Sequence, residues 1–218
     1  MGAEEIRKRA VVAVIRGAKT ETILPIASAL EAGGVTALEI TMEIPKALKI
    51  IEKLCEEFGN KLLIGAGTVL DAYTAREAIM AGSQFVFSPS LKKETIEMAK
   101  RYGVISVPGA FTPTEILSAY EYGADLVKVF PANVGGPEYL KSLAGPLPHI
   151  PLMPTGGINL QNASEFIKAG AAAIGAGSTL VDPKNEMTDR YLEQICLNAK
   201  RFMQAAKSEP IFQEAPLT

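Results

Sequence analysis

Short apolar runs alternate with longer amphipathic segments along the whole chain. The runs cover residues 10–15, 37–41, 62–64, 85–87, 104–107, 126–130, 151–153 and 172–174, and their composition predicts buried β-strands. The segments between them carry apolar residues at helical spacing, as Ile23, Ile26 and Leu30 do. The pattern therefore predicts a strand followed by a helix, repeated eight times.

The predicted helices have recognisable starts and ends. We expect a short charged helix over residues 4–9 and further helices that begin near Thr20, Pro45, Asp71, Lys92, Thr112, Pro137, Asn159 and Asn185. Glycine suits the left-handed conformation in which helices often end. Five of the predicted helices end this way, and an apolar run follows each within a few residues, at Gly33, Gly82, Gly103, Gly123 and Gly170.

The repeated strand–helix unit predicts an α/β protein with a parallel sheet covered by helices. Eight units in about 200 residues fit a single closed (β/α)8 TIM barrel, here with a short N-terminal helix. An open doubly wound sheet is the alternative, but it needs two edge strands, and no run is polar or interrupted enough to be one. We expect the barrel domain to span residues 1–207 and residues 208–218 to form a loosely held tail.

Composition narrows the classes of function. The net charge of −2 gives no general attraction for nucleic acid or anionic membranes, and an aromatic content of 6% argues against a stacking surface for single strands. No apolar run is long enough to cross a bilayer. Cys55 and Cys196 lack metal or disulfide spacing, which suits a reducing cytoplasm, and the single histidine argues against a histidine-rich metal site. We expect a cytoplasmic protein without metal, nucleic-acid or membrane partners.

Two charged residues stand inside apolar runs. Lys128 lies in the middle of run 126–130, where its stem must pack among apolar neighbours. Burial disfavours the ammonium form, and a neutral amine attacks carbonyl carbon. Glu39 lies in run 37–41, and a buried glutamate is unfavourable unless it is paired or catalytic. A Lys128 that reaches solvent, or a structural Glu39–Lys128 ion pair, is the alternative. Because both residues lie where strands of a barrel converge, we favour catalysis.

Further candidate residues follow the strands at the carboxyl end, where barrel enzymes hold their sites. Arg16 and Thr68 offer a guanidinium for a carboxylate and a hydroxyl, with a surface salt bridge as the alternative for Arg16. Two glycine-rich segments follow the last two strands, at residues 155–157 (Thr155, Gly156, Gly157) and 175–178. Backbone amides in such loops bind anions, so their position predicts a phosphate site, although a single glycine cluster is often only a turn.

Seven segments in this order resemble a known enzyme family. These segments are 37–41 (ALEIT), 65–69 (GAGTV), 87–89 (FSP), 107–109 (VPG), 127–132 (VKVFPA), 154–157 (PTGG) and 175–178 (GAGS). On these segments the chain resembles, from Val11 to about Leu180, the class I aldolases that cleave 2-keto-3-deoxy-6-phosphogluconate (KDPG) and the related 4-hydroxy-2-oxoglutarate (KHG) aldolases.

The resemblance implies a homotrimeric (β/α)8 barrel that uses no metal or cofactor and acts on a 2-keto-3-deoxy sugar acid or its phosphate. It implies that Lys128 forms a Schiff base, that Glu39 is the general acid and base, and that Thr68 binds the pyruvate carboxylate. Pro89 and Phe130 would line the pocket. The residues implied to bind phosphate are Gly156, Gly157, Gly177 and Ser178.

One position departs from the family pattern. Many members carry an arginine two residues after the threonine of the second-strand motif, where it binds the substrate carboxylate, and here that residue is Glu43. A negative charge there would repel a carboxylate. Other members have an arginine after the first strand, so we expect Arg16 to supply the missing charge.

The implied reaction is cleavage of KDPG to pyruvate and glyceraldehyde 3-phosphate, with cleavage of 4-hydroxy-2-oxoglutarate to pyruvate and glyoxylate as a second reaction. Three alternatives remain open at this point. They are an aldolase for the galactonate-derived phosphate, a sugar-phosphate isomerase or epimerase, and a non-catalytic barrel that binds sugar phosphates.

Overall fold

Strands and helices alternate from one end of the protein to the other. The structure is a computed structural model that describes residues 2–182 and 184–207; the predicted tail at 208–218 lies outside the described residues. The helices are α1 (Ala3–Arg9), α2 (Ile23–Ala32), α3 (Ala47–Phe58), α4 (Ala72–Met80), α5 (Lys93–Arg101), α6 (Pro113–Glu121), α7 (Ala132–Ala144), α8 (Ala163–Lys168) and α9 (Asp189–Ala205). The strands are β1 (Val11–Ile15), β2 (Ala37–Thr41), β3 (Leu63–Gly67), β4 (Phe85–Phe87), β5 (Ile105–Val107), β6 (Gly109–Ala110), β7 (Val127–Val129), β8 (Leu152–Pro154) and β9 (Ile174–Ala176).

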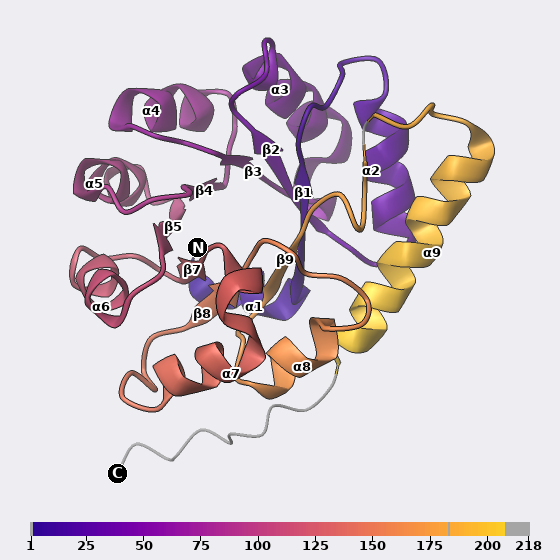
Figure 1. Ribbon diagram of the computed structural model, residues 1–218. Helices are drawn as coiled ribbons and strands as arrows, with labels where there is room; N and C mark the ends of the chain where they lie inside the picture. The colour runs from indigo at the N-terminus through magenta and orange to yellow at the C-terminus, as the bar shows by residue number, and fades with distance from the viewer. Residues whose placement is uncertain (1, 183, 208–218) are drawn as a thin grey trace.

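The strands form two parallel sheets surrounded by helices (Figure 1). Six strands pair in the order β5-β4-β3-β2-β1-β9, and three pair in the order β6-β7-β8. Hydrogen bonds join the sheets on both sides: the Lys128 amide donates to the Pro108 carbonyl at 2.9 Å, and the Ala172 amide donates to the Leu152 carbonyl at 2.8 Å. The α/β class with a curled parallel sheet is confirmed, while the closed barrel of eight strands stays a prediction.

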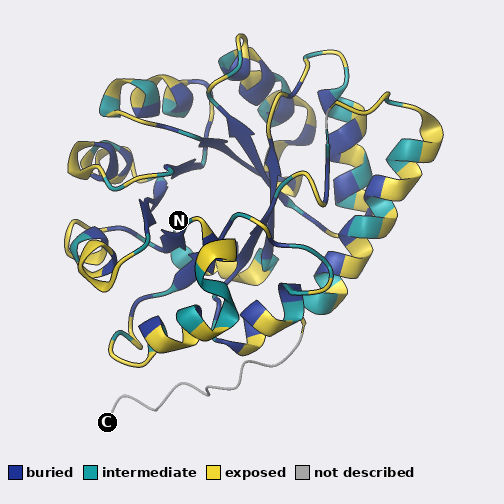
Figure 2. Cartoon of the chain, in the orientation of Figure 1, coloured by how far each residue is buried: buried dark blue, intermediate teal, exposed yellow. Residues whose placement is uncertain are grey.

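The apolar runs form strands because both of their faces are buried. One hydrophobic cluster lies between the sheets and the helices, and Figure 2 shows buried strands at the centre with exposed residues on the outer faces of the helices. A second cluster lies on the inner, concave side of the curled strands: Ile6, Val12, Ala37, Leu63, Phe85, Phe87, Ile105, Val107, Leu126, Met153 and Ala173. Parallel strands covered on both sides need this continuous apolar character.

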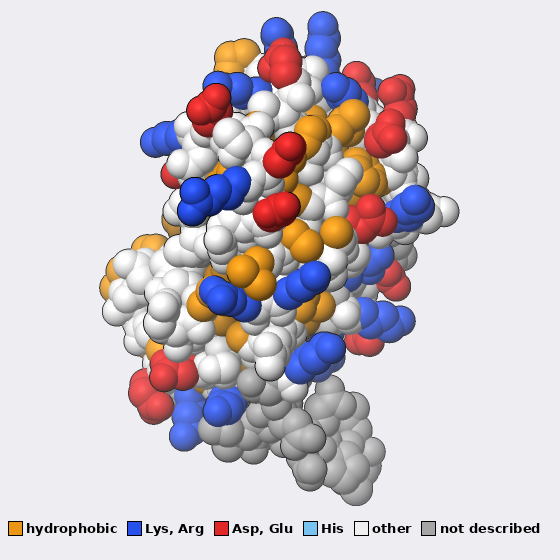
Figure 3. Space-filling view, turned by 90° about the vertical axis from the view of Figure 1, so that its right-hand side faces the viewer, with side chains coloured by type: hydrophobic (Ala, Val, Ile, Leu, Met, Phe, Trp, Pro, Cys, Tyr) orange, Lys and Arg blue, Asp and Glu red, His pale blue; other side chains and the backbone are white. Residues whose placement is uncertain are grey.

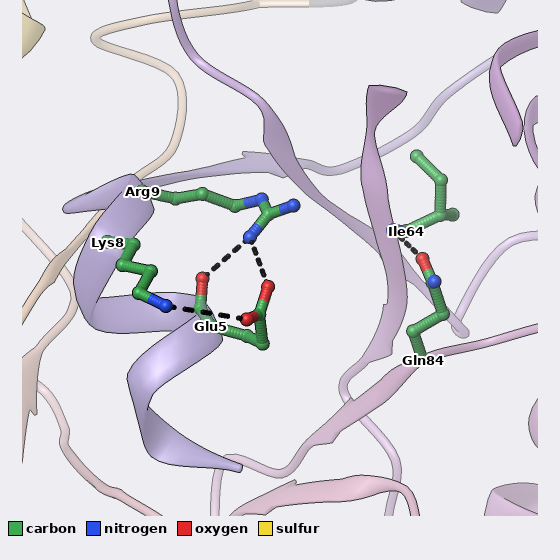
Figure 4. Close-up of polar contacts among 5 residues, drawn as sticks. All are labelled: Glu5, Lys8, Arg9, Ile64 and Gln84. Carbon is green, nitrogen blue, oxygen red and sulfur yellow. Dashed lines mark hydrogen bonds and ion pairs between the residues drawn. The ribbon is translucent and has the colours of Figure 1, made fainter. Parts of the chain in front are cut away.

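Helix α1 supplies Ile6 to the inner cluster. In Figure 4, Arg9 extends from the end of this helix and donates to the carboxylate of Glu5 at 2.9 Å, while Lys8 lies 4.0 Å from the same carboxylate. Nearby, the Gln84 side chain accepts a hydrogen bond from the Ile64 amide. The predicted N-terminal helix is therefore confirmed.

The helix ends follow the predicted glycine rule. Six glycines with positive φ follow described helices: Gly34, Gly59, Gly82, Gly103, Gly123 and Gly170. For the first of them the prediction was off by one residue, because Gly33 keeps a right-handed φ of −85° and Gly34 makes the left-handed turn with φ 90°. The caps at Asp71 and Thr112 are confirmed, because each side chain accepts a hydrogen bond from the backbone amide of the residue three positions later.

Several predicted boundaries were wrong. The last strand is 174–176 and not 172–174, so Gly175 belongs to the strand, where its missing side chain leaves room for Thr155. Helix α8 was predicted to begin near Asn159, but Asn162 is the residue that precedes it. The Asn159 side chain instead accepts hydrogen bonds from two backbone amides in the turn before the helix. Other starts shifted by two or more residues: α2 follows Thr22, α3 follows Lys46 and α9 is capped at Thr188. Helix α7 begins at Ala132, but Gly136 interrupts it with φ 70° and ψ −176°, so its second part begins near Pro137 as predicted.

The surface agrees with the small net charge. On the face that carries α9 and α2, acidic and basic side chains interleave among apolar ones (Figure 3). Within the described residues, no helix is both long enough and apolar enough to cross a membrane.

Candidate active site

Lys128 points into the interior between the curled strands, toward Glu39. It is the central residue of β7 and is only 5% exposed. Its two neighbours, Val127 and Val129, pack in the outer cluster under the helices, as the alternation of side chains along a strand requires. The ammonium nitrogen Nζ lies 5.3 Å from the ring centre of Phe130 and 5.8 Å from that of Phe87. The amine is thus held in an apolar, aromatic environment, as the sequence predicted.

Glu39 faces Lys128 from β2. Its side chain is fully buried, and its Oε1 atom lies 3.9 Å from Lys128 Nζ. Among the residues that the structure describes, neither carboxylate oxygen has a hydrogen-bond partner. Burial raises the pKa of Glu39, although the positive charges of Lys128 and Arg16 oppose the shift. The two residues thus converge as the sequence predicted, and the carboxylate oxygens keep free acceptor positions among the described residues.

A glycine makes room for this carboxylate. Gly67, at the end of β3, lies directly against Glu39, and a Cβ atom at this position would overlap the carboxylate group. In the parallel pair of β2 and β3, Thr41 lies beside Gly67. Glu39 precedes Thr41 by two residues, so its side chain lies on the same face of β2, farther from the carboxyl end of the strand. The glycine-rich sequence after the third apolar run therefore has a steric reason in the site.

The ends of β1, β2 and β3 bring a polar cluster together. Arg16 Nη1 lies 3.0 Å from Glu43 Oε1, and Arg16 Nη2 lies 3.4 Å from the Thr68 hydroxyl. The Thr41 hydroxyl lies 2.8 Å from the same Glu43 oxygen. Arg16 and Thr68 thus adjoin, as the sequence suggested. A surface salt bridge was the alternative for Arg16, and the structure forms one with Glu43, a partner that the sequence did not identify.

Thr68 is held in an uncommon backbone conformation. Its φ of 56° is in the left-handed region, which β-branched residues rarely adopt and which is unfavourable by about 1–3 kcal/mol. Hydrogen bonds hold the chain on either side: the Met42 amide donates to the Gly67 carbonyl and the Val69 amide to the Phe87 carbonyl. Such strain is common at binding sites. The conformation fixes the Thr68 hydroxyl next to Arg16.

The two glycine-rich loops after β8 and β9 are joined by a side chain. The Thr179 hydroxyl donates to the Ile158 carbonyl at 2.6 Å, which links one loop to the other. Gly156 and Gly157 have φ values of 94° and 74°. Within the described residues, the amide of Ser178 donates to no protein acceptor and its side chain is exposed. The arrangement leaves backbone groups available to an anion. Thr179 was missed by the sequence reading, although it is a hydroxyl next to Ser178.

The remaining predicted residues lie at the same carboxyl end of the strands. Thr155 is 6% exposed, and its hydroxyl has no partner among the described residues. Phe130 is half-buried, and its ring lies beside Gly156, where an added Cβ atom would come within 3.3 Å of it. Pro89 is half-buried after β4, and its carbonyl passes so close to Gly109 that a side chain there would overlap it. Gly177 begins the loop after β9, where its carbonyl accepts the amides of residues 180 and 181.

The donor set does not favour a metal ion. Among the described residues, no three His, Cys, Asp or Glu side chains group closely enough to hold one. The chemistry available is that of a buried amine beside a carboxylate with a raised pKa, near a guanidinium, several hydroxyls and glycine-rich loops. A carbonyl compound that carries anionic groups at its ends would match these groups.

Comparisons with known proteins agree with this chemistry. A sequence model of the "KDPG and KHG aldolase" family matches residues 3–195. A 2-dehydro-3-deoxy-phosphogluconate aldolase of Pseudomonas aeruginosa is 41% identical over 82% of this chain and 80% of its own length. A 2-dehydro-3-deoxy-6-phosphogalactonate aldolase of Escherichia coli is 32% identical over 92% of this chain and 98% of its own. The solved structure of KDPG aldolase from Legionella pneumophila, with pyruvate captured as a covalent carbinolamine intermediate, is 31% identical, with a TM-score of 0.84 over 92% of this chain and 97% of that one.

The raised pKa of Glu39 predicts a pH dependence of stability. Because the folded-state pKa of Glu39 lies above the ordinary value of 4.5, protonated Glu39 favours the folded state. Its contribution to the free energy of unfolding is fully present below pH 4.5 and is lost as the pH rises through the folded-state pKa. Glu39→Gln removes this titration. The free energy of unfolding of the variant, measured by urea denaturation, should therefore exceed that of the wild type by a margin that grows as pH rises above 4.5.

Glu52→Gln is the matched control, because it removes an exposed carboxylate of α3. Its pH curve should run parallel to that of the wild type. Parallel curves for Glu39→Gln and the wild type would contradict the assignment of a raised pKa to Glu39.

Proposed function

The chain belongs to the KDPG and KHG aldolase family of carbon–carbon lyases, and on that premise we propose that it is a Schiff-base aldolase that cleaves KDPG to pyruvate and glyceraldehyde 3-phosphate. The observation that carries the proposal is the position of Lys128 Nζ, 3.9 Å from a buried carboxylate with no hydrogen-bond partner among the described residues. An amine in apolar surroundings is the nucleophile that such a reaction needs.

The proposal includes the closed eight-strand barrel and the homotrimer that the resemblance implies. Closure is supported by the hydrogen bonds between the two sheets at Pro108 and Leu152 and by the parallel bridge between Thr155 and Gly175. In this arrangement β5 and β6 are two parts of one barrel strand on either side of Pro108. A cytoplasmic location and a small-molecule substrate belong to the same proposal.

The first chemical stage joins substrate and enzyme. Neutral Lys128 attacks the C2 carbonyl carbon of the 2-keto acid, and the carbonyl oxygen takes up a proton to give a carbinolamine. Glu39 then gives a proton to the carbinolamine hydroxyl, which leaves as water, and an iminium forms between Nζ and C2. A carboxyl group with a raised pKa suits this exchange, because it can hold the proton that it must donate.

The second stage breaks the carbon–carbon bond. The iminium withdraws electrons, so the C3–C4 bond cleaves when the C4 hydroxyl gives its proton to the Glu39 carboxylate. The C4 fragment leaves as an aldehyde, and the bonding electrons remain on the pyruvate fragment as an enamine. Protonation of the enamine at C3 and hydrolysis of the resulting iminium release pyruvate and restore Lys128 and Glu39. The lysine performs covalently what a metal ion would do as a Lewis acid.

The two ends of the substrate meet different groups in this proposal. Arg16 and Thr68 bind the carboxylate next to C2. The loops at 155–157 and 177–178 bind the phosphate through backbone amides and the Ser178 hydroxyl. The rings of Pro89 and Phe130 line the pocket between them. The buried Thr155 hydroxyl, which has no partner among the described residues, can bind a hydroxyl of the sugar acid.

Two related substrates are second candidates. The relative named for the galactonate-derived phosphate is aligned over 98% of its own length, so its substrate deserves the same assay. The family description includes KHG, which gives glyoxylate in place of the phosphorylated aldehyde. Comparison of kcat/KM for these three substrates ranks them. An isomerase, an epimerase or a non-catalytic binding barrel would not need a lysine that forms a Schiff base.

Borohydride reduction in the presence of pyruvate should trap a covalent adduct on Lys128. The mass of the protein should rise by one reduced pyruvyl group, and peptide mapping should find the group on Lys128. Lys128→Met should gain none, whereas Lys100→Met, which removes a surface lysine paired with Asp125, should be labelled like the wild type. A wild-type protein that gains no mass would rule out the Schiff-base aldolase.

A negative charge in the second loop should affect only phosphorylated substrates. Ser178→Asp should raise the KM for KDPG by about tenfold or more, because like charges within a few ångströms repel strongly. The KM for 4-hydroxy-2-oxoglutarate should change little. Ser142→Asp, an exposed substitution on α7, is the control. Equal changes in KM for both substrates would contradict a phosphate site at Ser178.

A further inference from the structure

Glu43 has no part in the mechanism described above, yet it is the residue most directly tied to Arg16. Its Oε1 atom lies 3.0 Å from Arg16 Nη1 and 2.8 Å from the Thr41 hydroxyl. Thr41 is fully buried at the end of β2, and its hydroxyl also lies 3.2 Å from the Ile15 carbonyl oxygen. Glu43 therefore connects a rigid strand end to a side chain that extends into solvent.

Arg16 would have little to hold it in place without this contact. Its side chain is 62% exposed. Besides its ion pair with Glu43, the guanidinium of Arg16 donates a hydrogen bond to the Thr68 hydroxyl among the described residues. This bond is long, at 3.4 Å. A long, exposed side chain samples many rotamers, and that freedom must be lost when it binds a ligand.

We propose that Glu43 is a positioning residue for Arg16. By accepting from Nη1, it holds the guanidinium beside the Thr68 hydroxyl, so that the remaining N–H groups of Arg16 and the O–H of Thr68 form a prearranged site for the carboxylate of the 2-keto acid. The inference rests on the proposed function and adds to it the residue that orders the carboxylate site.

The geometry decides between this role and simple repulsion. Oε1 of Glu43 is engaged by two donors, and the guanidinium lies between Glu43 and Thr68. The Arg16–Glu43 pair carries no net charge, so it gives the site little long-range attraction for anions. What it retains is the directional fork of N–H groups that a planar carboxylate fits. Glu43 thus weakens the long-range attraction of the site for anions, but it fixes the orientation of the Arg16 guanidinium.

The experiment is a double-mutant cycle on purified full-length protein with KDPG as substrate. Glu43→Ala should raise KM by about tenfold with kcat within about twofold, the signature of lost substrate binding and not of lost chemistry. Glu43→Gln keeps an acceptor for Arg16 and Thr41 and should restore most of the affinity. In the Arg16→Ala background, Glu43→Ala should have no further effect, because there is no guanidinium left to position.

Two controls separate this role from folding and from the proposed function. Glu21→Ala removes an exposed carboxylate from the loop between β1 and α2 and should leave KM unchanged. Thermal unfolding of each variant reports any loss of structure. Borohydride trapping of the wild type with pyruvate tests the Schiff base independently, so a protein that is trapped but shows no effect of Glu43→Ala on KM would overturn only the role of Glu43.

Two other results would also overturn the inference. A lower KM in Glu43→Ala would mean that Glu43 repels the substrate. An equal loss in the wild-type and Arg16→Ala backgrounds would mean that Glu43 acts through the fold and not through Arg16.

Discussion

The burial of one amine and one carboxylate between the curled strands is the constraint on which the rest of the structure depends. Neither oxygen of Glu39 has a hydrogen-bond partner among the described residues, and the attraction of Lys128 at 3.9 Å does not compensate for the loss of water, since the pKa of Glu39 is raised. A fold can hold such a pair only if the surrounding packing is strong. The aliphatic cluster outside the strands and the apolar cluster inside them supply that packing.

The same constraint explains features that look unrelated in the sequence. Gly67 has no side chain because the Glu39 carboxylate occupies the space, and the aromatic rings of Phe87 and Phe130 surround the amine. Polar groups that can reach solvent lie at the strand ends, among them Arg16, Thr68 and the glycine loops. The interior thus sets reactivity, and the ends of the strands set what can bind.

Much of this could be predicted from the sequence because it rests on local rules. Strand character follows from continuous apolar runs, helix ends from glycine, and the site from two charged residues inside such runs. The sequence could not predict contacts that depend on three-dimensional packing. The extent of β9 follows from the fit of Thr155 over Gly175, and the bond from Thr179 to Ile158 joins loops about 20 residues apart. The pairing of Glu43 with Arg16 likewise depends on the close approach of two strand ends.

In the proposed reaction, Lys128 forms a covalent bond to the keto carbon while Glu39, on β2, exchanges protons with the substrate. A crystal structure of the protein soaked with pyruvate tests this most directly. We expect continuous electron density from Lys128 Nζ to C2 of pyruvate, with the Glu39 carboxylate within hydrogen-bonding distance of the bound ligand. Pyruvate held without a bond to Lys128, or bound away from Glu39, would contradict it.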